Sequence, residues 1–285
     1  MTGGDIMANS SRRGRAFTPS SIALATCGIG VLAFLALPIL IVVPMSFSSA
    51  ESLRFPPPGF SLRWYVSFFG DPQWLEAATN SLVIGVTSST IALALGTMAA
   101  YGLVRGGFRG RRLVEANFIA PMVLPPVIVA VALYIFYARL GILGSYLALI
   151  AAHAVLAVPY VVLLMSLAIQ AFDIRIEQVA MTLGASRAQM MLRVLLPNLL
   201  PNAAAAWLFA FVISFDEVVV TLFVSGTHLT VPKRMFNQLV LQINPTITAI
   251  ATLLILFSLT AVAIGSWLAR GSTLMPGRSD DRSGQ

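Results

Sequence analysis

Six long stretches of this 285-residue sequence carry almost no charge, and the first runs uncharged from Ala16 to Ala50. A membrane-spanning helix needs about 20 consecutive apolar residues. With 58% hydrophobic and only 10% charged residues, the chain has too few charges to cover a soluble domain. This excludes a cytosolic enzyme and a disordered tail protein. The sequence predicts an all-α, polytopic membrane protein with six transmembrane helices, at about 21–45, 79–104, 115–138, 146–169, 202–224 and 246–269.

The basic residues favour one orientation of these helices. Positively charged side chains accumulate in loops that stay in the cytoplasm. If the N-terminus is inside, 13 of the 18 Lys and Arg residues fall on the inner side and 5 on the outer side. We therefore expect a multi-pass protein of the inner (plasma) membrane, with a transmembrane domain at 21–270 between cytoplasmic tails at 1–20 and 271–285. Basic residues in the cytoplasmic loops also explain the net charge of +7. We therefore expect the lipid bilayer as a partner and no nucleic acid.

Proline and aromatic residues predict where the helices bend or lie along the surface. A loop rich in both predicts a short interfacial helix near 61–69 on the outer side. Three prolines should kink the third span, and two more should bend the chain before the fifth; they are Pro121, Pro125, Pro126, Pro197 and Pro201. The segment 227–245 is expected to be a loop. A signal peptide ending near Ala50 is the alternative for the first span, which however far exceeds the 7–15 apolar residues of such a peptide.

Motifs for catalysis are missing from the sequence. No phosphate-binding GxxxxGK[ST] loop occurs, and the single lysine, Lys233, follows a proline in an outer loop. Neither an HExxH zinc motif nor a GxSxG nucleophile elbow is found. We expect Cys27 to be a small apolar residue of the first span and His153 to bond a neighbouring helix. The chain is predicted to have no catalytic residues, to bind no metal or cofactor, and to hydrolyse no ATP by itself.

The loop after the fourth span carries the most specific pattern. Ile176, Val179 and Leu183 recur at the spacing of one apolar helix face. Gly184 is well placed to end this short helix, and Ser186 can cap a second helix with Gln189 as its capping-box partner. The prediction is a helix, a break and a helix on the cytoplasmic side. Either it lies on the membrane surface as an amphipathic linker, or it docks onto another protein.

This loop resembles the cytoplasmic EAA loop of ABC-importer permeases, in which E-A-A is followed by G and then by I-x-L-P at fixed spacing. The matching residues are Gln178-Val179-Ala180, Gly184 and Val194-Leu195-Leu196-Pro197. Gln178 replaces the Glu and Val179 the first Ala, and Glu177 is the neighbouring residue that would supply the charge. The resemblance implies that the loop couples the chain to an ATPase through Glu177, Gln178, Val179, Ala180, Leu183, Gly184, Ala185, Ser186 and Pro197.

Other segments are similar to the PotC-like family of spermidine/putrescine permeases. They are Phe211–Gly226 with its acidic pair, Met122–Pro126, and Asn244-Pro245 with the residues that follow. The resemblance implies the type I ABC-importer permease fold and a heteromeric importer. Its other parts would be a second, PotB-like permease, two copies of an ATPase subunit that binds the ATP, and an extracytoplasmic solute-binding protein.

The acidic pair Asp216 and Glu217 lies in an otherwise uncharged stretch from Val194 to His228. Ionised side chains within a membrane are costly and usually face a cavity, a partner or a solute path. Either the pair attracts a cationic solute, or it forms a structural salt bridge or a wet helix end. With the resemblance, a polyamine is the expected solute; an organic amine, thiamine, opine, phosphonate or ferric iron is the alternative. A stand-alone ion-coupled transporter or an intramembrane enzyme would leave the EAA spacing unexplained.

Overall fold

The computed structural model describes residues 19–241 and 245–270, and within them the chain is almost entirely helical. Apolar segments in lipid must satisfy their own backbone hydrogen bonds, which a helix does. The described residues contain no strand beyond an isolated bridge between Ser48 and Phe60. The elements are α1 (Pro19–Ser46), α2 (Arg63–Gly70), α3 (Pro72–Arg105), α4 (Arg111–Val123), α5 (Pro126–Arg139), α6 (Tyr146–Ala171), α7 (Ile174–Thr182), α8 (Arg187–Met190), the π-helical turn η1 (Met191–Leu195), α9 (Leu196–Phe215), α10 (Val219–Val224), α11 (Val231–Leu241) and α12 (Thr246–Arg270).

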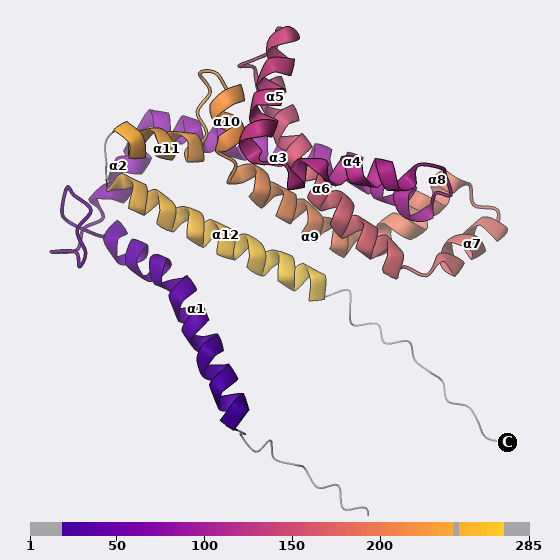
Figure 1. Cartoon of the computed structure of the whole chain (residues 1–285), viewed down its shortest axis with the longest axis horizontal. Coiled ribbons are helices and arrows are strands. Elements are labelled where there is room, and N and C mark those ends of the chain that lie inside the picture. The colour runs from indigo at the N-terminus through magenta and orange to yellow at the C-terminus, as the bar shows by residue number, and fades with distance from the viewer. Residues whose placement is uncertain (1–18, 242–244, 271–285) are drawn as a thin grey trace, which may run out of the picture.

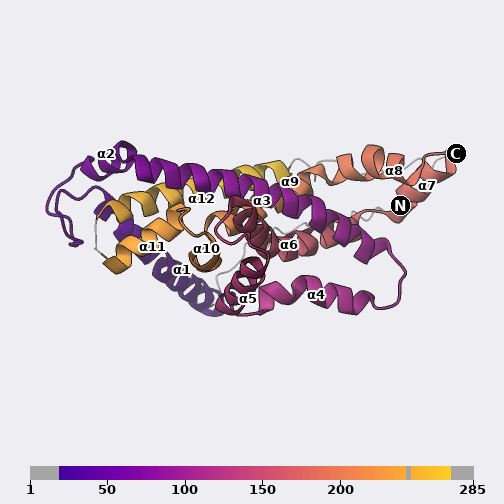
Figure 2. The same ribbon diagram turned by 90° about the horizontal axis from the view of Figure 1, so that it is seen from above.

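The long helices form an elongated bundle (Figure 1). α3, α6 and α9 pack against one another, α12 packs against α9, and α1 contacts α12 at the edge of the bundle. Short helices mark the two ends in both views (Figures 1 and 2): α2 and α11 at one end, α7 and α8 at the other. We refer to these as the α11 end and the α7 end. Residues 1–18 of the predicted tail at 1–20, the predicted tail at 271–285, and Asn244 lie outside the described residues.

The prediction of apolar spans is confirmed for five helices, which are long and apolar enough to cross a membrane. The third predicted span differs, because α4 and α5 meet at an angle of 105°. Leu124 and Pro125 are extended at the break, since a residue before proline is pushed out of the helical region and proline donates no hydrogen bond. The expected kink is therefore a sharp bend between two helices, and it lies at Pro125-Pro126 and not at Pro121, which is inside α4.

Small residues hold the centre of the bundle together. The core between α3, α6 and α9 contains six buried alanines: Ala92, Ala100, Ala157, Ala203, Ala206 and Ala210. At Gly96 of α3, a Cβ atom would stand 2.6 Å from Cγ1 of Val161 in α6, so only glycine allows this approach. Helices in membranes associate through such close packing, since lipid offers no hydrophobic driving force between them. Many apolar side chains on the outside of the bundle are exposed, among them Phe34, Val123 and Leu147.

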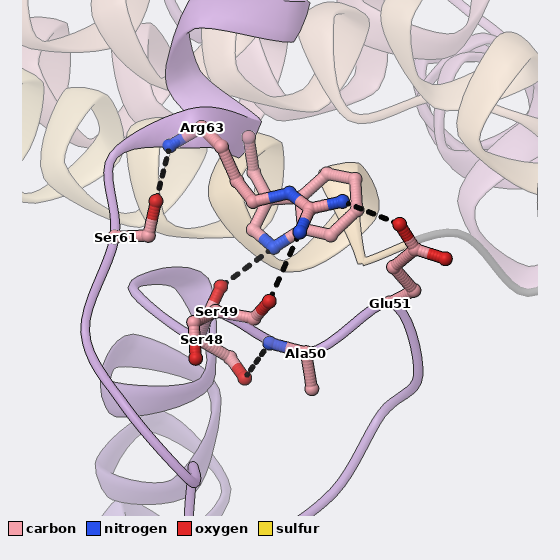
Figure 3. A network of polar contacts seen from close by, with 7 residues as sticks. Ser48, Ser49, Ala50, Glu51, Ser61 and Arg63 are labelled. Carbon is pink, nitrogen blue, oxygen red and sulfur yellow. Dashed lines mark hydrogen bonds and ion pairs between the residues drawn. The ribbon is translucent and has the colours of Figure 1, made fainter.

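A polar turn joins α1 to α2 (Figure 3). Arg63 donates hydrogen bonds to the Ser49 carbonyl at 3.0 Å and to Glu51 at 2.9 Å. Its guanidinium lies 4.4 Å from the ring centre of Trp64, whose Nε1 donates to the Ser48 carbonyl at 2.8 Å. These contacts fix α2 at the end of α1 and confirm the predicted short helix near 61–69.

The fifth predicted span is broken, and the segment after it is not a plain loop. α9 ends at Phe215, and the chain leaves the helix at the acidic pair before α10 begins at Val219. Residues predicted as loop form α11, with Thr230 before its first turn and Pro232 in that turn. Proline in the first turn after a threonine is a helix-start signal that the sequence carries.

Candidate functional site

The segment at 173–197, predicted to couple the chain to an ATPase, has the expected helix, break and helix. Asp173 caps α7 by accepting a hydrogen bond from the Arg175 amide at 2.9 Å. Gly184 ends it with a φ of +89°, which favours glycine. Ser186 then forms a full capping box with Gln189, confirming the predicted start of the second helix.

The apolar face of α7 points away from the rest of the chain. Ile176, Val179 and Leu183, predicted to share one face, are 46%, 56% and 83% exposed. Gln178 and Gly184 are exposed beside them, whereas Ala180 and Ala185 are half-buried. A short helix with apolar side chains on its outer side offers a surface for another protein or for lipid.

Glu177 has the opposite environment, because its side chain turns into the chain. It is 3% exposed and forms an ion pair with Arg105 at 2.8 Å. Tyr101 donates a further hydrogen bond to its second carboxylate oxygen at 3.3 Å. The Glu177 carboxylate therefore bonds residues within the chain, and its neighbour Gln178 is the polar side chain that is exposed.

Arg105 gathers the ends of three helices. Its Nε donates to Glu177 of α7 at 2.9 Å, and its Nη2 donates to the carbonyls of Ile169 and Phe172 at the end of α6 at 3.0 and 2.8 Å. Arg105 is itself the last residue of α3. A cavity of about 420 Å³ opens beside it, lined by both charged residues and by Gln178 and Arg187. The sequence showed Arg105 only as one basic residue at the end of a span, and nothing in it signalled this pairing.

The prolines after this segment do not bend the chain as expected. α8, η1 and α9 follow one another as a single span candidate, Arg187–Phe215. The irregularity is the π-helical turn η1, which ends two residues before Pro197. Because proline cannot donate to the preceding turn, the helix widens there, and Asn198 Nδ2 donates to the Val194 carbonyl. Pro197 lies in the first turn of α9 and Pro201 inside it.

The acidic pair sits at the break between α9 and α10, with the two carboxylates in different surroundings. Glu217 Oε1 accepts the Val220 amide at 2.8 Å and so bonds a donor in the first turn of α10. Asp216 is exposed, and no side chain or amide of the described chain bonds its carboxylate. Such breaks within a membrane are tolerated where the backbone is buried or lines a cavity.

A buried polar cluster holds this break in place. His153 of α6 lies 2.8 Å from Ser214 Oγ through Nδ1 and 2.9 Å from Thr221 Oγ1 through Nε2. Ser214 also bonds Ser88 of α3 at 2.8 Å. The prediction that His153 bonds a neighbouring helix is confirmed, and the residues on both sides of the acidic pair are tied to α6.

A second ion pair, between buried Arg234 and half-buried Asp71, holds the α11 end, and the sequence did not signal it. Arg234 of α11 pairs with Asp71 at 2.7 Å and lies 4.4 Å from the ring centre of Trp74. Lys233 donates to Ser225 Oγ at 2.7 Å and to the Gly226 carbonyl at 2.8 Å, and its burial lowers the pKa of its amine from the ordinary value. Among the described residues, no group of three or more His, Cys, Asp or Glu side chains is placed to hold a metal.

Comparison with known proteins gives one consistent result. Residues 92–273 match the family described as "Binding-protein-dependent transport system inner membrane component". The chain is 31% identical over 244 residues to the spermidine/putrescine transport system permease protein PotC of Escherichia coli K12, covering 85% of this chain and 92% of PotC. It is 34% identical over 248 residues to the putrescine transport system permease protein PotI of the same strain, covering 83% and 85%.

A solved structure supports the fold at low sequence identity. The crystal structure of a bacterial ABC transporter involved in the import of the acidic polysaccharide alginate contains a chain that matches with a TM-score of 0.59 at 16% identity. The match covers 90% of this chain and 99% of that one. The expected all-α permease fold is thereby confirmed.

Proposed function

Because the chain belongs to the family of binding-protein-dependent transport system inner membrane components, we propose that it is the permease subunit of an ATP-driven importer of polyamines. The observation that carries the solute is the identity of 31% and 34% to permeases named for spermidine and putrescine, over more than four fifths of the chain. The exposed Asp216 carboxylate within an uncharged stretch supports a cationic solute.

The α7 end is the cytoplasmic end in this proposal. It holds Arg105 and the basic loop that follows. If the N-terminus is inside, the sequence assigns 13 of the 18 basic residues to the inner side, which agrees with the positive-inside rule. The α11 end then faces outward, where an extracytoplasmic binding protein delivers the solute. Under this proposal both termini are expected in the cytoplasm.

Two copies of an ATPase subunit bind the ATP, and one of them docks on the exposed face of α7. Ile176, Val179 and Leu183 supply the apolar part of that contact and Gln178 the polar part. A second, PotB-like permease completes the pathway. The exposed apolar side chains of α4 and α5 support this, because α4 buries none of its residues within the described chain.

Asp216 attracts the cation, while Glu217 shapes the break that presents it. The Glu217 carboxylate accepts a hydrogen bond from an amide of α10 and so has a structural role. The Asp216 carboxylate is exposed and can bind a solute. A charged side chain inside a membrane is expected to line such a path.

The proposal is tested by ATP hydrolysis of the complete complex in vesicles. Binding protein loaded with spermidine or putrescine should stimulate phosphate release, and binding protein loaded with an uncharged polyol should not. If another solute stimulated hydrolysis and neither polyamine did, the chain would still be an importer subunit, but polyamines would not be its solute. If binding protein stimulated no phosphate release with any solute, the proposal that the chain is an importer subunit would be wrong.

A further inference from the structure

The buried ion pair of Arg105 and Glu177 joins α7 to the rest of the molecule. The side chains are 15% and 4% exposed, and Arg105 also holds two carbonyls at the end of α6. Separating such a pair would leave a charge buried without its partner, which is strongly destabilising. Any displacement of α7 is therefore transmitted to the end of α3 before the pair breaks.

α3 is built to carry such a displacement. It is a continuous helix of 34 residues, about 50 Å long at 1.5 Å per residue. Its single proline, Pro72, is in the first turn, so no proline interrupts it. Gly85 and Gly96 bring it close to Phe211 of α9 and Val161 of α6, where an added Cβ would stand 2.9 and 2.6 Å from their side chains.

The same helix reaches the acidic break and the α11 end. Ser88 bonds Ser214, two residues before Asp216, at 2.8 Å. Further along, Asn80 Nδ2 donates to the Leu229 carbonyl at 3.0 Å, and Ser81 Oγ accepts the Val231 amide at 2.9 Å. One rigid element thus contacts the coupling helix, the residues beside the acidic pair and the start of α11.

The geometry points to α3 as the element that carries the movement of α7 to the acidic break, with Arg105 and Glu177 as the positioning residues that join the two helices. This inference rests on the proposed function, since it requires an ATPase that moves α7. Neither side chain touches solute or ATPase; both act through α3. Packed side chains, polar networks and rigid secondary elements of this kind can carry coupling between distant sites.

The test measures ATP hydrolysis and spermidine uptake in the same vesicles, with the complete complex and its binding protein. Arg105→Gln and Glu177→Gln each remove one charge of the pair, and Arg109→Gln removes the same charge as Arg105→Gln from an exposed position in the loop after α3. We expect the first two variants to retain the ATPase subunits and stimulated hydrolysis but to import about tenfold less spermidine per ATP, while Arg109→Gln behaves as wild type.

Two outcomes of this experiment would overturn the inference. Uptake per ATP in Arg105→Gln equal to that in Arg109→Gln would show that the pair transmits nothing. Loss of the ATPase subunits from both variants would show that the pair serves docking. A wild-type complex that takes up no solute with ATP contradicts the proposed function instead, so the two failures are distinguishable.

A distance measurement keeps the inference testable if uptake is lost altogether. With Cys27 replaced by serine, spin labels at Arg175→Cys on α7 and Met98→Cys on α3 occupy exposed positions. We expect one narrow distance distribution in the complex with and without ATP, and a broad one after Glu177→Gln. A distribution that stays narrow after Glu177→Gln would contradict the joining role of the pair.

Discussion

Asp216 and Glu217 are neighbours in the chain, but their carboxylates have different roles in the structure. Asp216→Asn should lower spermidine uptake by about tenfold or more, since a hydrogen bond to a charged group contributes about 1.5–3 kcal/mol. The complex should assemble normally, because the Asp216 side chain is exposed. Uptake in proteoliposomes measures this, with Glu76→Gln as the control for loss of another exposed carboxylate of the membrane domain. Uptake at the wild-type level would contradict the proposal that Asp216 lines the solute path.

The buried ring of His153 joins Ser214 and Thr221, which lie on the two sides of the break at the acidic pair. His153→Ala leaves Ser214 and Thr221 each without one buried partner and should cost about 1–3 kcal/mol of stability. A lower unfolding temperature of the purified complex would report it. His228→Ala, which removes the other histidine of the chain, should have the smaller effect. Equal effects of the two variants would contradict the role of His153 at the break.

At the scale of elements, the end of α7 depends on the backbone of Gly184. Its φ of +89° disfavours residues with a Cβ atom, although no atom lies within 4 Å of the place where that Cβ would stand. Gly184→Ala should therefore shift the end of α7 at a cost of about 1–2 kcal/mol and weaken binding of the ATPase. Gly184→Asn should weaken it less, because asparagine tolerates this region better. Co-purification of the ATPase measures both, and an Ala variant that retained it fully would contradict the expectation.

The elements also show which features a sequence can predict. The apolar spans, the capping box at Ser186 and the apolar face of α7 follow from local composition and spacing, and the structure has all three. The break at the acidic pair was missed because it depends on Glu217 accepting an amide in place of the helix. α11 was missed because a charged, short helix has no long apolar run, although Thr230 and Pro232 signal its start.

The pairs that tie distant segments together could not be predicted at all. Arg105 and Glu177 are 72 residues apart, and Arg234 and Asp71 are 163 apart. Before the helices are packed, any basic residue at the end of a span could pair with any acidic residue at the same end. Their packing, set by small residues on α3, α6 and α9, selects the partners.

At the scale of the whole molecule, the orientation in the membrane is a direct expectation. In a variant with Cys27→Ser, Val240→Cys at the α11 end should react with a membrane-impermeant maleimide added to intact cells. Arg109→Cys, in the loop after α3, should react only once the cells are permeabilised. The opposite pattern would invert the molecule and place α7 outside the cytoplasm, where it could not contact an ATPase.

We propose that this chain imports polyamines and that ATP hydrolysis drives the import. The measurement that addresses it most directly is uptake of radiolabelled spermidine and putrescine by proteoliposomes that contain the complete complex and its binding protein, with and without ATP. We expect accumulation only with ATP, and loss of accumulation in Asp216→Asn. Accumulation that is equal without ATP and follows an imposed ion gradient would contradict it, because the chain would then be working as an ion-coupled transporter.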